Sequence, residues 1–347
     1  MNHCIILIYM KPKDTETELS ASIKAELISI GSVRIDKSLL SDEHKITVNT
    51  GLKASNSAIF LRSGKRRVRL TVNDLSPLRI VPEGEQVVVL KNEDELFRGV
   101  PEHSLCHCPE QAYITISEKC VYDCQFCQLP KLQGGIKSSA TVQQMVAEAY
   151  TTGDLKAISL TSGVAVSPKK EVERMASIVK QLTRKYDLPI GVSIYPTKDS
   201  SEELYSAGAC EVKYNVGTMD PELFRSFCPQ LSLHEVLDAL ENAVNIFGRN
   251  RVSSNLIIGL GENDETIRKG VMYLTDRCII PILRPRPISS YSSESALEKV
   301  NRPNAARLLR LGIMLRNMLD RQSLCIDKSR TMCLLCTGCD ITPHIDV

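Results

Sequence analysis

The sequence predicts an α/β protein whose core is a partial (β/α)6 barrel, with a small β-rich domain before it and a cysteine-rich tail after it. Two observations support this fold class. From Gln111 onward six strand-like runs alternate with helical segments, as in parallel α/β folds. The 13 cysteines also gather mainly in groups around the start of the barrel and in the tail. We expect the domains to span 1–109, 110–300 and 301–347.

Composition limits the classes of partner. A hydrophobic content of 43% is ordinary for a globular protein, and a net charge of +2 gives no reason to expect nucleic acid. No stretch approaches the ~18–20 apolar residues that span a bilayer. The start, Met1 to Tyr9, lacks a basic region and a cleavage site, so we interpret it as a strand rather than a signal peptide. In a reducing cytoplasm, so many cysteines indicate metal or cluster ligation rather than disulfides.

The first 109 residues predict an amphipathic helix over Glu16–Ile30 and then a small antiparallel sheet. Its short runs are separated by turn residues. They are Ser32–Ile35, Ala58–Leu61, Val68–Val72, Leu78–Val81, Gln86–Leu90 and Leu96–Val100. The basic run Lys65–Arg69 falls at a hairpin turn, where we expect a solvated strand edge. No catalytic motif occurs here, which leaves a substrate-covering or partner-binding domain.

The barrel segment carries clear start signals for its helices. The strands are predicted at Ala112–Ile116, Ala157–Leu160, Ile190–Tyr195, Glu211–Val216, Val252–Ile258 and Ile279–Leu283. Capping boxes are expected at Thr141 with Gln144, Ser200 with Glu203, and Ser232 with Glu235. Ser167 precedes a first-turn proline, and Gly248 can end the fourth helix. Because chemistry gathers at the C-terminal ends of barrel strands, those ends are the candidate site.

Directly after the first barrel strand, Cys120, Cys124 and Cys127 form a C-x3-C-x2-C loop. Three thiolates can hold three irons of a [4Fe–4S] cluster and leave the fourth iron open. The alternative is a zinc site, which prefers a fourth ligand nearby unless it is catalytic.

A second group, Cys333, Cys336 and Cys339, stands at C-x2-C-x2-C in the tail. This spacing indicates an auxiliary [4Fe–4S] cluster, with a structural zinc knuckle as the competing interpretation. Its fourth ligand is not evident: Cys106, Cys108, Cys325 and a non-cysteine side chain are the alternatives. The isolated cysteines Cys4, Cys210, Cys228, Cys278 and Cys325 are expected to be small buried side chains.

The first cysteine loop resembles that of the radical S-adenosylmethionine (SAM) superfamily, and the resemblance implies SAM as a second cofactor. In that family the open iron chelates the SAM amino and carboxylate groups. Carried over by position, the implied SAM-binding residues are Phe126, Thr161, Ser162, Gly163, Asn215, Gly259, Gly261, Glu262 and Arg284. Thr-Ser-Gly replaces the family's Gly-Gly-Glu, and Gly217 replaces an acidic residue near Asn215. Arg284 pairs either with the SAM carboxylate or with a structural partner. No catalytic side chain is identified.

Nearly the whole chain resembles the archaeal biotin synthase-related group of this superfamily. The resemblance rests on Lys24–Val33, Cys108–Ala112, Leu160–Val164, Asn255–Glu262 and Cys333–Asp340. Members of that group resemble the two-subunit archaeal-type lipoyl synthase. The implied activity is a transferase reaction that inserts sulfur into a protein-bound octanoyl chain. A true biotin synthase is disfavoured, because Ser253 stands where that enzyme has a cysteine of its second cluster.

The resemblance implies a mechanism and partners. The 5′-deoxyadenosyl radical would remove hydrogen from an unactivated carbon, and a sulfide of the tail cluster would trap the carbon radical. Implied partners are a second radical SAM subunit, an octanoylated carrier protein and a reducing ferredoxin or flavodoxin. The alternatives are a radical SAM enzyme whose tail cluster transfers electrons or orients substrate, a methyltransferase (disfavoured without a cobalamin region), and a non-catalytic or zinc-binding partner subunit.

Overall fold

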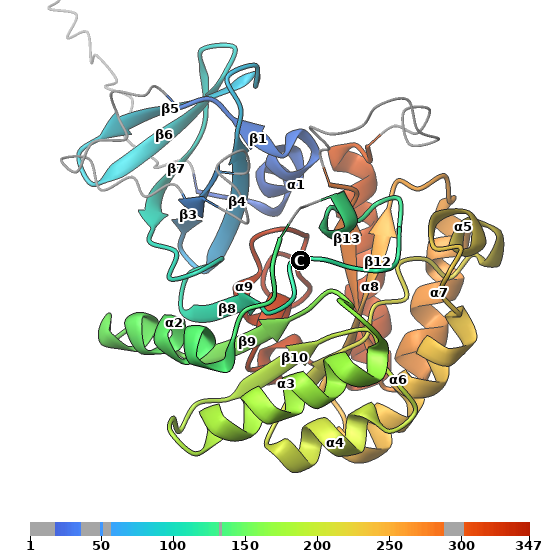
Figure 1. Cartoon of the computed structure of the whole chain (residues 1–347). Helices are drawn as coiled ribbons and strands as arrows, with labels where there is room; N and C mark the ends of the chain where they lie inside the picture. The colour runs from blue at the N-terminus through green and yellow to red at the C-terminus, as the bar shows by residue number, and fades with distance from the viewer. Residues whose placement is uncertain (1–17, 36–48, 51–56, 132–133, 288–301) are drawn as a thin grey trace, which may run out of the picture.

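The computed structural model describes residues 18–35, 49–50, 57–131, 134–287 and 302–347. These residues form two separate sheets, one of seven strands and one of six, with the C-terminus of the chain lying between them (Figure 1). The strand predicted at the very start of the chain, and Cys4 within it, lie outside the described residues.

The N-terminal sheet has the order β1-β4-β3-β7-β6-β5, with β2 on β3. Its pairings are antiparallel except for β1 with β4. The strands are β1 (Ser32–Val33), β2 (Asn49–Thr50), β3 (Ser57–Ser63), β4 (Arg66–Val72), β5 (Leu78–Glu83), β6 (Gln86–Lys91) and β7 (Asp94–Glu102). Before them, helix α1 (Ala21–Ile30) begins at Ser20, whose hydroxyl accepts from the Ile23 N–H, and ends at Gly31 with φ +72°.

One expectation for this sheet is wrong. The basic run Lys65–Arg69 is not wholly a solvated edge, because Arg67 is buried and Arg69 is half-buried. Arg67 forms ion pairs with Glu102 and, at 3.0 Å, with Glu110. Alternation along a strand sends every second side chain to the same face, so a basic run in β4 places part of its charge inside the molecule.

The second sheet is parallel throughout and follows the chain in the order β8 to β13. Its strands are β8 (Gln111–Thr115), β9 (Ala157–Thr161), β10 (Ile190–Ser193), β11 (Glu211–Lys213), β12 (Val252–Ile258) and β13 (Ile280–Pro285). The sheet curls into a half-barrel, and the predicted α/β fold is confirmed (Figure 1).

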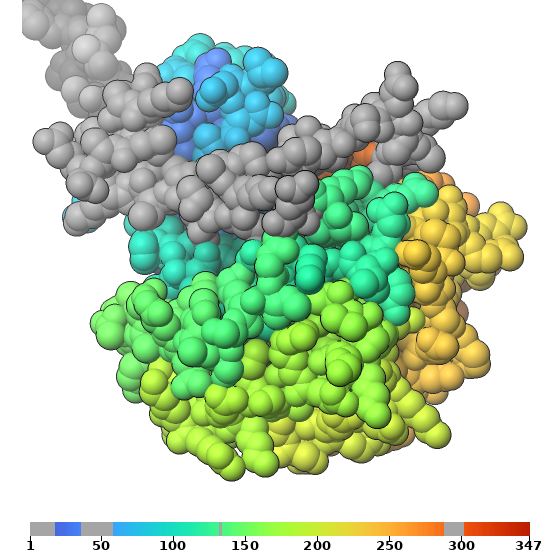
Figure 2. Space-filling view, in the orientation of Figure 1, coloured from blue at the N-terminus to red at the C-terminus, as the bar shows by residue number. Residues whose placement is uncertain are grey.

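Helices wrap the outer side of the half-barrel and form a continuous surface on the face shown in Figure 2. They are α2 (Ser139–Thr151), α3 (Pro168–Thr183), α4 (Ser200–Ala207), α5 (Pro221–Phe227), α6 (Leu233–Phe247) and α7 (Asp264–Asp276), with a 3-10 turn η4 at Leu129–Lys131. One large apolar core lies between these helices and the strands. Residues that alternate along a strand, such as Ala112 and Ile114, belong to it, whereas Tyr113 between them faces the other way.

The helix starts confirm some predicted caps and correct others. The Ser232 hydroxyl accepts from the Glu235 N–H, and Ser167 caps α3 before Pro168, as predicted. Helix α2 instead begins one turn before Thr141, because Ser138 accepts from the Thr141 N–H. The Ser200 hydroxyl donates to the Thr197 carbonyl at 2.9 Å and does not cap α4.

The tail contains α8 (Ala305–Arg321), the 3-10 turn η6 (Ile326–Lys328) and the short helix α9 (Met332–Cys336), which carries two of the three tail cysteines. It enters the half-barrel from the amino-terminal ends of its strands. The Thr331 hydroxyl donates to Glu211 Oε2 at 2.6 Å, and the Met332 N–H donates to Ser159 Oγ at 2.9 Å. A side chain at Gly191 would meet Thr331 Oγ1 at 2.1 Å, so a glycine here lets the tail pass.

Candidate functional site

The first cysteine loop leaves β8 and is held by the turn that follows β9. The Val164 N–H donates to Cys120 Sγ at 3.4 Å, and the Val121 N–H donates to the Val164 carbonyl at 2.7 Å. Gly163 makes this approach possible, since a Cβ there would lie 2.4 Å from the Lys119 carbonyl oxygen. The predicted Thr161-Ser162-Gly163 segment therefore lies directly against the cysteine loop.

Ser162 within that segment is turned toward a buried carboxylate. Its hydroxyl donates to Glu171 Oε1 at 2.6 Å, and Ser117 donates to the same oxygen at 2.7 Å. Arg174 completes the group with a 2.6 Å ion pair to Glu171. The backbone of this segment therefore lies beside the cysteine loop, whereas the Ser162 side chain points to Glu171.

On its other side, the loop rests on the end of α5. The Gln125 N–H donates to the Phe227 carbonyl at 2.9 Å. Cys228, predicted to be an isolated buried cysteine, is buried but in contact with Cys124. A hydrogen bond with Cys228 and burial raise the pKa of Cys124, and burial raises the pKa of Cys127 to about 11. The position of Cys228 in the sequence, far from the cysteine loop, does not predict this contact.

Phe126, the predicted adenine neighbour, packs against the turn after β11. Its ring lies 6.4 Å from that of Phe227, and a Cβ on Gly217 would meet its edge at 3.1 Å. Gly217 has φ +70°, so the position that the family fills with an acidic residue here favours glycine. Asn215 is exposed close by and accepts from the Asn255 N–H at 3.2 Å.

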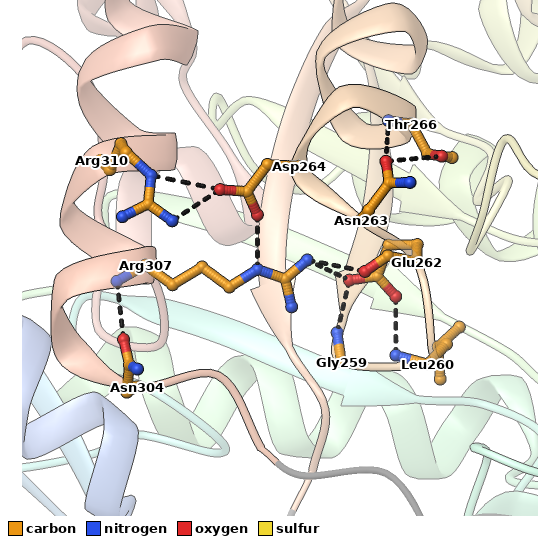
Figure 3. A network of polar contacts seen from close by, with 9 residues as sticks. All are labelled: Gly259, Leu260, Glu262, Asn263, Asp264, Thr266, Asn304, Arg307 and Arg310. Atoms are coloured by element: carbon orange, nitrogen blue, oxygen red, sulfur yellow. Dashed lines mark hydrogen bonds and ion pairs between the residues drawn. The ribbon is translucent and has the colours of Figure 1, made fainter.

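Glu262, a SAM-binding residue by resemblance, is hydrogen-bonded within its own turn. Its two carboxylate oxygens accept from the Gly259 and Leu260 N–H groups at 2.8 and 2.7 Å, and Arg307 of α8 pairs with it at 3.0 Å (Figure 3). These contacts occupy a carboxylate that is itself buried. Glu262 therefore shapes the turn after β12, in which Gly259 and Gly261 have φ of +100° and +119°.

The tail cysteines lie on the inner side of the half-barrel. Lys213, at the end of β11, donates to Cys333 Sγ at 3.0 Å, and the Tyr113 hydroxyl lies 4.0 Å from the same sulfur. Although burial alone would raise it, the pKa of Cys333 is lowered by the charges of Lys213 and Arg284. A hydrogen bond from Cys108 lowers the pKa of Cys336 to about 7 despite burial.

Arg284 faces these cysteines. Its guanidinium lies 3.5 Å from Asp340, next to Cys339, which favours the structural ion pair over a SAM carboxylate. Protein surrounds the side chain, yet 21% of its surface stays accessible. The His107 side chain is exposed to solvent, while the protein around it and the charges of Arg69, Arg284 and Lys213 lower its pKa.

The N-terminal sheet closes over the tail loop. The Arg69 N–H donates to the Gly338 carbonyl at 2.7 Å, and Arg67 donates to the Cys336 carbonyl at 3.1 Å. Buried Lys24 of α1 donates to the Thr337 carbonyl at 2.8 Å and pairs with Asp346 at 2.5 Å. The strands of the N-terminal sheet therefore cover the tail cysteines, and the substrate-covering or partner-binding role of this region stays a prediction.

The donor sets of both groups suit iron–sulfur clusters, because each consists of cysteine thiols in one loop or turn. Within the described ranges, no three His, Cys, Asp or Glu side chains converge closely enough to hold one metal ion. A cubane spreads its ligands over several irons and so requires a wider arrangement than a single ion does.

A curled parallel half-barrel with three cysteines directly after its first strand defines a class of cluster-binding enzyme. Residues 114–272 match the family model described as the Radical SAM superfamily, and this match supports membership of the chain in that superfamily. In the part of the chain that the structure describes, no helix has the length and apolar character to cross a membrane.

Known relatives match only parts of the chain. A GTP 3′,8-cyclase 2 of Pseudomonas aeruginosa is 22% identical over 52% of this chain and 55% of its own length. The ribosomal protein uS12 methylthiotransferase RimO of Prochlorococcus marinus is 35% identical over 32% of this chain and 24% of its own. The chain thus spans about half the length of the cyclase and a quarter of the methylthiotransferase.

A solved structure shows the same fold. The FeFe-hydrogenase maturase HydG of Carboxydothermus hydrogenoformans superposes with a TM-score of 0.51 at 18% identity. The superposition covers 60% of this chain and 51% of that protein. It supports the half-barrel and carries no information about the reaction.

Proposed function

We propose that this radical SAM enzyme inserts sulfur into an unactivated C–H bond, and that its substrate is a protein-bound octanoyl chain in lipoyl cofactor synthesis. The observation that carries the proposal is the second cysteine group. Cys333 lies inside the same half-barrel whose strand ends carry the first group, in contact with Lys213 of β11. A sulfur source held there would face the space where a substrate carbon is activated.

The first group is the candidate SAM site. A reduced [4Fe–4S] cluster on Cys120, Cys124 and Cys127 would supply the electron that cleaves SAM into methionine and a 5′-deoxyadenosyl radical. The chain positions the nucleoside and excludes water. Phe126 offers an apolar ring beside Gly217, and the Gly259–Gly261 turn, fixed by Glu262, lets the backbone come close to a ligand.

The similarity to a methylthiotransferase supports sulfur chemistry, since that protein's name describes transfer of a sulfur-containing group. The similarity to the cyclases supports the SAM-cleaving half of the reaction only. A second radical SAM subunit, an octanoylated carrier protein and a reducing ferredoxin or flavodoxin are proposed partners, on the resemblance to the two-component lipoyl synthase.

The test uses anaerobically reconstituted protein with SAM, a reductant and an octanoylated carrier, with and without the partner subunit. We expect 5′-deoxyadenosine and a carrier whose mass increases by sulfur. An unchanged carrier mass alongside normal SAM cleavage would overturn sulfur insertion and leave the radical SAM activity intact. Without SAM cleavage, the chain would be a non-catalytic subunit.

A second candidate is favoured by one specific contact. Cys108 lies against Cys336, so the tail has a fourth thiol within reach. A cluster with four cysteine ligands can equally serve electron transfer or substrate orientation, neither of which needs an open iron. Iron content after multiple turnovers separates the two candidates: sulfur donation consumes the tail cluster, whereas electron transfer preserves it.

A further inference from the structure

The sequence leaves the fourth ligand of the tail group open among Cys106, Cys108, Cys325 and a side chain of another type. We propose that Cys108 is that ligand, and that Cys108, Cys333, Cys336 and Cys339 form one four-thiolate site for a [4Fe–4S] cluster. This inference rests on the proposed second cluster. It also assigns the N-terminal sheet a role, as the wall that closes the site.

The position of Cys108 distinguishes it from the other candidates. Its side chain is fully buried and packs with Cys336 and Phe60, with Tyr113 beside them. It is hydrogen-bonded to Cys336 and lies within electrostatic range of Cys333 and Cys339. All four thiols therefore share one enclosed volume, although Cys108 is more than 200 residues away from the others.

Cys106 and Cys325 face elsewhere. Cys106 is two residues from Cys108, yet its charged neighbours are Glu148 of α2 and Lys137. The Cys325 N–H donates to Asn250 Oδ1 at 2.7 Å, which places this residue at the amino-terminal end of β12. Residues 105–107 form a bend, so the alternation of an extended strand, which would put Cys106 and Cys108 on the same side, does not apply to them.

Positive charge surrounds the four thiols. Lys213 donates to Cys333 Sγ, Arg284 lies near three tail cysteines, and Arg67 donates to the Cys336 carbonyl. Four thiolates around a cubane carry net negative charge, which is costly inside a protein unless cations compensate it. Arg67 comes from β4 of the N-terminal sheet, so this sheet contributes to the compensation as well as to the enclosure.

The experiment isolates the tail by working in a Cys120/Cys124/Cys127→Ala background, full length and reconstituted anaerobically with iron and sulfide. In this background we compare Cys108→Ser with its neighbour Cys106→Ser as the matched control. Iron and sulfide per chain, Mössbauer spectra and EPR are the readouts. None of them depends on catalytic activity.

We expect about four irons per chain in the background and in Cys106→Ser, the content of one cubane. Cys108→Ser should fall to about three irons, with the EPR signal of an oxidised [3Fe–4S] form. Should Cys108→Ser fail to fold, Cys108→Asp offers an oxygen ligand of similar size, and an altered EPR spectrum of the reduced cluster is then expected.

Two results would overturn the inference, and they differ. Unchanged iron and spectra in both Cys108 variants, or a loss in Cys106→Ser instead, would refute Cys108 as ligand while leaving the tail cluster in place. No iron in the background itself would refute the tail cluster and, with it, the proposed sulfur source.

Discussion

The two cysteine groups differ in the charged groups that surround them. In the first loop, burial and neighbouring thiols raise the pKa of Cys124 and Cys127. In the tail, the charges of Lys213 and Arg284 lower the pKa of Cys333 and a hydrogen bond lowers that of Cys336, whereas burial raises the pKa of Cys339. Backbone groups of the turn after β9 and of α5 hold the loop, whereas cationic side chains from both sheets enclose the tail.

This difference indicates different tasks. A site that must admit a ligand cannot be filled with the protein's own charges, and SAM brings a sulfonium cation to the first loop. A site that holds a permanent anionic group is stabilised when the protein supplies the compensating cations. The surroundings of the first loop therefore suit a site where SAM binds and leaves, and those of the tail suit a site that holds an anionic cluster.

The largest effect is expected from removing the first loop's ligands. The Cys120/Cys124/Cys127→Ala variant should produce no detectable 5′-deoxyadenosine, because no cluster remains to reduce SAM. Chromatography of the reaction products measures this directly. The Cys333/Cys336/Cys339→Ala variant is the control: it should lose about four of about eight irons and still cleave SAM. Equal loss of cleavage in both variants would contradict the division of tasks.

A large loss of stability is expected when the buried ion pair between α1 and the tail, Lys24 with Asp346, is removed. Lys24→Met leaves Asp346 buried without its 2.5 Å partner and should lower the free energy of unfolding by about 3–5 kcal/mol. Arg66→Met, which removes a partly exposed contact at 3.9 Å to the same carboxylate, should cost at most about 1 kcal/mol. Urea denaturation of both proteins gives the comparison, and similar costs would show that Lys24 has no special role.

Lys213→Met tests the charge compensation in the tail. It removes the donor at 3.0 Å from Cys333, which should make the tail cluster harder to reduce. We expect the reduction potential to fall by about 60 mV, equivalent to about 1.4 kcal/mol for one electron. A redox titration followed by EPR in the Cys120/Cys124/Cys127→Ala background measures this potential. Tyr113→Phe removes a hydroxyl at 4.0 Å and should shift the reduction potential less. A larger shift in Tyr113→Phe than in Lys213→Met would show that Tyr113, and not Lys213, is the main stabilising group.

The smallest effect is expected at Gly217, in the turn after β11 that contacts Phe126 of the first loop. Gly217→Ala places a methyl group 3.1 Å from the Phe126 ring and a non-glycine residue at φ +70°, at a backbone cost of about 1–2 kcal/mol. SAM binding, measured by calorimetry, should weaken as the ring moves. Gly64→Ala has a similar φ of +59° but open space around it. If both variants weakened SAM binding equally, Phe126 would not be the cause.

Sequence reasoning was most successful where the signal was local. The six barrel strands appear where alternation of strands and helices predicted them, and Ser232 caps α6 as its pattern indicated. Where several hydroxyl residues compete within one turn, local pattern does not choose between them. Ser138 takes the cap expected of Thr141, because the helix begins one turn earlier. Arg67 is buried because its side chain lies on the inner face of β4. A run of basic residues in the sequence does not show which face of a strand each of them takes.

By itself, the sequence determined which residues have the chemistry: two sets of three cysteines, each closely spaced along the chain. Such spacing brings ligands together whatever the rest of the fold does. Only the tertiary structure decided which distant groups join them. It placed Cys228 beside Cys124, Cys108 beside Cys336, and Lys213 on Cys333. These contacts depend on how β8, β11, α5 and the tail pack, and packing across a hundred or more residues leaves no periodic trace in the sequence.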